Sequence, residues 1–220
     1  MSLRQAVYDE FEKARLRYCV LREDPSNRNG EVDLLVDPRD RQRAAAVLRA
    51  AGCIPLPTWG RGSHRFFLCY DPADDSWTKF DVVTAFAFGQ YQELRTGAAR
   101  ACLARRLTHT SPARLDPDDD FWALLLHCTL DRPRLSLRSR LSLRPRLSAR
   151  PRLSARQRRG LAVLAPHART DGPLARWVAQ ACAPGEIVAM AQTGDWQSLA
   201  ALGTRLRAAR PVGSRLAARG

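Results

Sequence analysis

Three carboxylates on two strand-like segments are the residues of this chain with the clearest chemistry. Glu31 and Asp33 lie in the segment 31–36, where an apolar residue stands at every second position. This period of two is typical of a β-strand. Both side chains therefore point to one face, about 6.6 Å apart. Asp81 lies in a second strand-like segment, 79–83. Carboxylates placed in this way can converge on a pair of Mg²⁺ ions about 3.5–4 Å apart.

Such a site suits phosphoryl-group chemistry. Mg²⁺ prefers hard oxygen ligands, and two Mg²⁺ ions can activate an attacking hydroxyl and steady a leaving pyrophosphate during in-line displacement. We therefore predict that Glu31, Asp33 and Asp81 are metal ligands. A second interpretation stays open at this point, in which Glu31 and Asp33 only form the solvated face of an edge strand.

Lys79 is a further candidate for contact with phosphate. It shares the face of Asp81 within its segment, and it is one of only two lysines among the 36 basic residues. An ammonium group at this place could neutralise a bound phosphate. The alternative is an ion pair on the strand face with no role in binding.

The segments that carry these residues resemble the nucleotidyltransferase superfamily that includes DNA polymerase beta. Glu31-Val32-Asp33-Leu34 matches the paired-acid strand of that family, Asp81 matches its third acid, and the segment 17–22 looks like the strand before them. The run from Tyr18 to Val36, followed by 79–84, is similar to uncharacterised bacterial nucleotidyltransferase family proteins. The resemblance covers about residues 1–90.

This resemblance implies an α/β (α+β) fold, in which a nucleotidyltransferase-like domain with a mixed sheet and flanking helices occupies residues 1–90. It also implies metal-dependent transfer of a nucleotidyl group from an NTP to an unknown hydroxyl or phosphate acceptor. Glu31 and Asp33 would then hold two Mg²⁺ ions, and Asp81 would bind one of them and help to deprotonate the acceptor.

One departure from the family concerns the phosphate-binding turn. The family has a Gly-Ser turn whose backbone and hydroxyl hold the triphosphate, and this chain has Leu21-Arg22 in its place. Arg22 could replace the turn as a phosphate-binding fork. Alternatively, the fold is catalytically degenerate and serves as a binding module.

The rest of the chain is predicted to be helical on both sides of a linker. We expect a helical part at 91–131 that packs on the first domain, a linker at 132–159 and C-terminal helices at 160–220. The acidic cluster Asp116-Pro117-Asp118-Asp119-Asp120 is typical of a helix N-terminus, where a cap, a proline and acidic residues are all favoured. We predict a helix start there instead of a metal site.

Much of the net charge of +14 lies in the predicted linker. Residues 132–159 contain eleven arginines and no acidic residue, and Arg-Leu-Ser recurs every six residues from Arg134. Neither a helix nor a β-solenoid suits this repeat, so we expect a disordered linker. It could bind nucleic acid through its positive charge, or it could be a low-complexity insertion without such a role.

The remaining observations concern the cysteines, one histidine and the compartment. The six cysteines are dispersed, so we expect reduced core residues and no structural zinc. His64 lies in a basic, glycine-containing segment, 59–65, which could contact phosphate or simply form a hairpin; we favour the hairpin, and a strand or loop histidine over a catalytic base. Without a membrane-length apolar stretch or a signal peptide, the chain is expected to be cytoplasmic and free of membrane contact.

Overall fold

The structure is a computed structural model, and it divides the chain into two compact units. It describes residues 2–23, 29–56, 62–89, 92–131 and 153–209. The first unit comprises Met1–Phe86 and Thr96–Asp116, and the second comprises Ala87–Arg95 and Pro117–Gly220. All three predicted metal ligands lie in the first unit.

The first unit is built on a five-stranded mixed sheet with the strand order β1-β2-β5-β4-β3. Its strands are β1 (Tyr18–Glu23), β2 (Gly30–Val36), β3 (Ile54–Pro55), β4 (His64–Asp71) and β5 (Ser76–Val83). β2 and β5 pair in parallel, whereas the other neighbouring strands pair antiparallel. A parallel pair needs a long crossover, and the chain from α2 (Arg41–Ala50) through β4 provides it.

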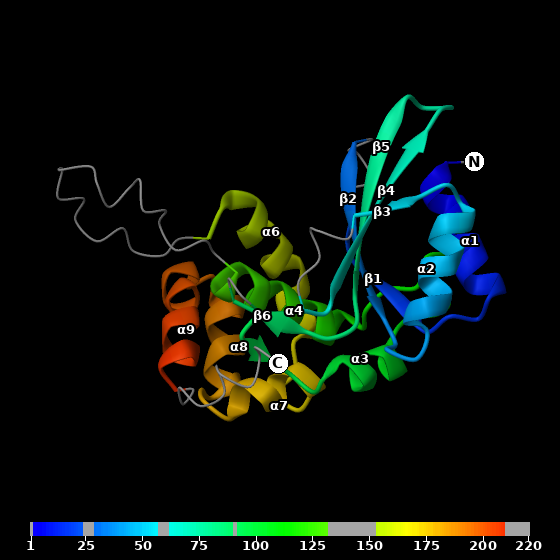
Figure 1. Cartoon of the computed structure of the whole chain (residues 1–220). Coiled ribbons are helices and arrows are strands. Elements are labelled where there is room, and N and C mark those ends of the chain that lie inside the picture. Colours follow the sequence, from blue (N-terminus) through cyan, green and yellow to red (C-terminus); the bar gives the residue numbers. More distant parts are fainter. Residues whose placement is uncertain (1, 24–28, 57–61, 90–91, 132–152, 210–220) are drawn as a thin grey trace, which may run out of the picture. The chain divides into compact units, whose positions relative to one another are not determined.

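One face of this sheet is sealed by α1 (Leu3–Lys13) and α2, which lie on the same side of it (Figure 1). The core between helices and sheet contains Phe11 of α1, Leu48 of α2 and Phe80 of β5, and none of the three is exposed. Because side chains alternate along a strand, the positions between the buried apolar residues of β2 and β5 point to the opposite face. The predicted ligands occupy those positions.

The cysteines differ in part from the prediction. Cys53 and Cys69 form a disulfide with a Cα–Cα distance of 4.3 Å, so the prediction that all six are reduced is wrong for this pair. Ile54 of β3 pairs with Leu68 of β4, which places the two cysteines opposite each other across the same antiparallel pair. This closeness depends on strand register, which the dispersed spacing in the sequence does not reveal. The other four are buried and lie outside this disulfide: Cys19, Cys102, Cys128 and Cys182. The first unit also contains α3 (Ala99–Arg105).

The second unit consists mostly of helices arranged around α4. A two-stranded sheet of β6 (Ala87–Phe88) and β7 (Leu94–Arg95) belongs to it, with α4 (Pro117–Leu130), α6 (Ala155–Leu164), the 3-10 helix η1 (Ala165–His167), α7 (Pro173–Ala179), α8 (Pro184–Thr193) and α9 (Trp196–Ala208). α4 packs against α6, α7 and α9. As predicted, α4 begins at Pro117 and has Asp118, Asp119 and Asp120 in its first turn.

The predicted class of fold is confirmed, with a mixed α/β arrangement and helices at the C-terminal end. The domain boundaries expected at residues 90 and 131 remain predictions.

Of the predicted linker, residues 132–152 lie outside the described residues. Its last residues are helical, because α6 begins at Ala155 with a capping box between Ser154 and Gln157. Within the described ranges, no helix has the length and apolar character needed to cross a membrane.

Candidate metal centre

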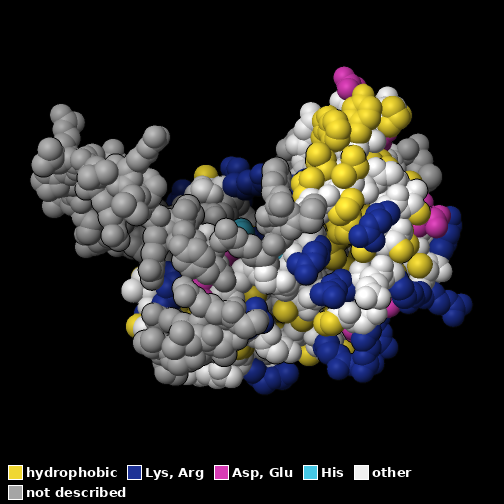
Figure 2. All heavy atoms as spheres, in the orientation of Figure 1, with side chains coloured by type: hydrophobic (Ala, Val, Ile, Leu, Met, Phe, Trp, Pro, Cys, Tyr) yellow, Lys and Arg dark blue, Asp and Glu magenta, His cyan; other side chains and the backbone are white. Residues whose placement is uncertain are grey.

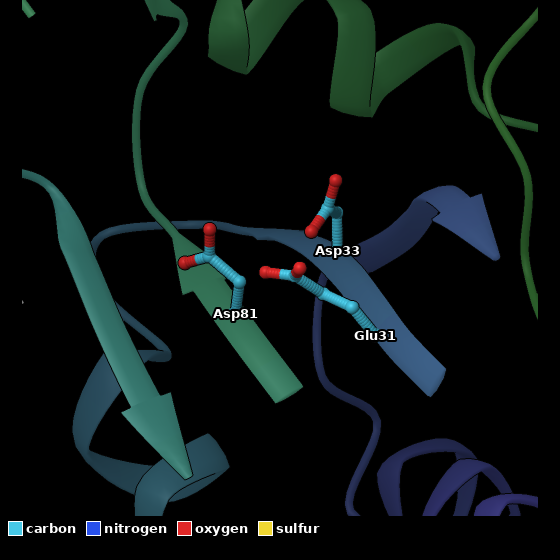
Figure 3. Close-up of side chains that lie close together, drawn as sticks. All are labelled: Glu31, Asp33 and Asp81. Carbon is cyan, nitrogen blue, oxygen red and sulfur yellow. The ribbon is translucent and has the colours of Figure 1, made fainter. Parts of the chain in front are cut away.

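The three predicted ligands come together on neighbouring strands. β2 and β5 pair in parallel with Asp33 opposite Asp81, and Glu31 lies two positions before Asp33 on the same face. Figure 3 shows the three carboxylates pointing toward one another from these two strands. One oxygen of each lies within 4.8 Å of the others. Among the described residues, this is the group of acidic, histidine or cysteine side chains whose geometry suits a metal ion.

Burial of the three carboxylates is uneven. Asp33 and Asp81 are only 9% and 6% exposed, whereas Glu31 is exposed. Three carboxylates held this close repel one another, because two unit charges about 4 Å apart near a protein surface interact by about 4 kcal/mol. The fold therefore has to supply positive charge at this place, from its own residues or from a bound cation. The donor set itself, three hard oxygen ligands, suits Mg²⁺.

Arg22 supplies the first positive charge. Its Nε lies 2.6 Å from Oδ2 of Asp33. The register between β1 and β2 shifts between Val20 and Arg22, and this irregularity places Arg22 opposite Asp33. The sequence predicted Arg22 as a phosphate-binding fork, and in the structure its guanidinium contacts a predicted metal ligand.

Lys79 supplies the second positive charge. Its Nζ lies 2.7 Å from Oε1 of Glu31, the residue opposite it on the parallel neighbour β2. The same Nζ is 4.9 Å from the ring centroid of Phe66 on β4, a distance that allows a cation–π contact. Lys79 thus makes the strand-face ion pair that sequence reasoning left open, and the pair lies within the carboxylate cluster.

His64 contacts the third carboxylate. Its Nδ1 is 2.9 Å from Oδ1 and 2.7 Å from Oδ2 of Asp81. Sequence reasoning missed this contact, because it interpreted His64 as an ordinary strand or loop residue. A signal was available in the hairpin of β4 and β5, whose short turn sets the register. Phe66 pairs with Asp81, so His64 lies diagonally across from Asp81 on the same face.

Each carboxylate of the cluster therefore has one nitrogen partner, and each partner comes from an adjacent strand. The contacts join β1 to β2, β2 to β5, and β5 to β4. These partners balance most of the negative charge of the cluster, and the three carboxylates remain close to one another. A bound cation would have to share the oxygens with these partners or displace them.

A pair of aromatic side chains lies further along the same hairpin. Tyr70 pairs with Trp77 across β4 and β5, and their ring centroids are 5.0 Å apart. Figure 2 shows hydrophobic side chains gathered over this hairpin. Trp77, Lys79 and Asp81 follow one another at every second position of β5, so they point to one face.

Comparison of the chain with protein-family models, curated proteins and solved structures finds no match.

Proposed function

We propose that this protein is a metal-dependent nucleotidyltransferase. The observation that carries the proposal is the convergence of Glu31, Asp33 and Asp81 from two parallel strands on a site that suits a divalent cation. The resemblance of these same segments to the nucleotidyltransferase superfamily supports it. The substrates would be an NTP and an acceptor with a hydroxyl or phosphate group.

The proposed reaction is an in-line displacement at the α-phosphorus of the NTP. An oxygen of the acceptor forms a bond to this phosphorus while the bond to pyrophosphate breaks, and pyrophosphate leaves with the electron pair. Asp81 would accept the proton of a hydroxyl acceptor. Glu31, Asp33 and Asp81 would hold Mg²⁺, which supplies positive charge next to the reacting oxygens. Arg22 and Lys79 are the candidates for contact with phosphate oxygens.

Binding of NTPs tests this proposal without knowledge of the acceptor. Calorimetry with each of the four common NTPs, with and without Mg²⁺, is expected to detect binding of at least one NTP that depends on Mg²⁺. Binding should be lost in Asp33→Asn and Asp81→Asn. Asp74→Asn is the matched control, because Asp74 is an exposed acid in the turn between β4 and β5. NTP binding or pyrophosphate release that survives both site substitutions would refute the assigned roles.

A second candidate function is that of a catalytically degenerate binding module. Leu21-Arg22 replaces the Gly-Ser turn of the family, and the Arg22 guanidinium contacts Asp33. In this case calorimetry would detect no NTP binding at any Mg²⁺ concentration. Nucleic acid is the partner suggested by the Arg-rich repeat. Deletion of residues 134–151 keeps the Ser154 cap of α6 and should abolish a salt-dependent gel shift; an unchanged shift would exclude this role for the repeat.

A further inference from the structure

We propose that the Lys79 ammonium group takes the place of a second divalent cation in the candidate metal centre. Glu31, Asp33 and Asp81 then hold one divalent cation instead of two. The inference rests on the proposed function, because it concerns the same site. It replaces the expectation of two Mg²⁺ ions with a centre made of one ion and one ammonium group of the chain itself.

The Lys79 ammonium group lies where a second ion would need a ligand. Lys79 Nζ lies 2.7 Å from Oε1 of Glu31, and Glu31 is one of the three carboxylates whose oxygens lie within 4.8 Å of one another. A second divalent ion a few ångströms from the first would need carboxylate oxygens of this cluster as ligands. One of the two Glu31 oxygens, Oε1, already forms an ion pair with Lys79.

The environment of the Lys79 side chain also favours a role in the site. Its side chain is 29% exposed, and the Phe66 ring lies 4.9 Å from Nζ. Lys13, the other lysine of the chain, differs in both respects. Its side chain is 71% exposed on α1, where it pairs with Glu10 three residues earlier. The Lys79 side chain is therefore shielded and lies beside the carboxylate cluster, whereas Lys13 has the environment of an ordinary surface lysine.

The balance of charge at the centre also favours one divalent ion. The three carboxylates carry three negative charges, and Arg22 and Lys79 return two positive ones at 2.6 and 2.7 Å. One divalent ion would leave the centre with a small positive charge, which suits the triphosphate of an NTP. Two divalent ions would add four positive charges next to two that the protein already provides, and like charges this close repel one another.

In the proposed reaction, Lys79 would then act where a second ion is expected. Its ammonium group would contact oxygens of the α-phosphate or of the leaving pyrophosphate, and it would move there from Glu31 when the NTP binds. Lysine suits this exchange because its ammonium is a compact point charge with three donors on a flexible stem. Phe66 would keep the stem next to the site in both positions.

Counting bound Mn²⁺ tests the inference independently of activity. Free Mn²⁺ is measured by electron paramagnetic resonance during a titration, and the sites that belong to the centre are those lost in Asp33→Asn. The wild-type chain should bind one Mn²⁺ at the centre. Lys79→Met should bind two, with the first bound about tenfold more tightly, because a competing positive charge is gone.

Two matched variants serve as controls. Lys79→Arg keeps the positive charge and should bind one Mn²⁺, and Lys13→Met removes the other lysine and should leave the count at one. Circular dichroism verifies folding, and the wild-type count decides the question by itself if Lys79→Met does not fold.

The outcomes separate the inference from the proposed function. Two Mn²⁺ ions at the wild-type centre would overturn the inference and leave the proposed function standing. One ion in Lys79→Met, bound as in the wild type, would also overturn it. No Mn²⁺ bound by the wild-type centre would overturn both.

Discussion

Phe80 and Asp81 are neighbours on β5, yet they belong to opposite faces of the sheet. Phe80 is fully buried in the core beneath α1 and α2, whereas Asp81 belongs to the carboxylate cluster on the other face. The difference shows how the strands can carry a cluster of like charges. One face provides the apolar burial that stabilises the unit, and the other places charges that repel one another and need partners.

The two faces of the sheet are therefore expected to have separate roles, one in stability and the other in metal binding. Substitutions of core residues on the helix-covered face should destabilise the unit without changing the ligands. Substitutions of the three carboxylates should change the affinity for cations with little effect on folding. Neighbouring residues on one strand point to opposite faces, so they serve as controls for each other.

The largest expected effect is on metal affinity. Asp81→Asn should lower the affinity for Mn²⁺ at least about 100-fold, because a carboxylate ligand is replaced by a neutral amide. Its unfolding free energy should change by about 1 kcal/mol or less, since relief of repulsion within the cluster opposes the weakened contact with His64. Calorimetry and urea unfolding measure the two quantities. A large loss of stability in Asp81→Asn would contradict the proposal that the two faces have separate roles in stability and metal binding.

The next effect is on stability. Phe80→Ala should lower the unfolding free energy by about 3–5 kcal/mol, the usual cost of removing a fully buried phenylalanine side chain. Urea unfolding followed by circular dichroism measures it. While the variant is folded, its Mn²⁺ affinity should match that of the wild type, and a matching loss of affinity would show that the two faces are coupled.

The smallest effect is expected at the exposed end of the carboxylate face. Trp77 is 47% exposed and contacts Tyr70 across the hairpin. Trp77→Ala should therefore cost only about 0.2–1 kcal/mol in unfolding free energy, the range of a cross-strand pair. A cost as large as that of Phe80→Ala would mean that this end of the hairpin is part of a core.

The sequence predicted which residues of one strand share a face, but it did not predict which residues meet across neighbouring strands. Alternation in 31–36 predicts that Glu31 and Asp33 share a face, because it depends only on the period of a strand. The pairing of Asp33 with Asp81 depends on which strands are neighbours, and spacing along the chain does not determine this. Asp81 was grouped with the other two because it lies in a strand-like segment and matches the third acid of a known family, and neither reason predicts its strand register with Asp33.

The nitrogen partners were hardest to predict. Arg22 reaches Asp33 because of an irregularity in β1, and His64 reaches Asp81 through the register of β4 and β5. The Cys53–Cys69 disulfide depends on register in the same way. In each case the interacting residues are separated by ten or more positions, so propensity and periodicity within one segment do not predict the contact. For His64, a signal was available in the short turn between β4 and β5, which sets their register.

The central claim is that Glu31, Asp33 and Asp81 hold a divalent cation, and anomalous diffraction from crystals of the full chain soaked in Mn²⁺ tests it most directly. The account predicts one anomalous peak within ligand distance of all three carboxylates, with Lys79 Nζ beside Glu31 or on a bound phosphate. Absence of a peak at this cluster, in crystals soaked at saturating Mn²⁺, would contradict the claim.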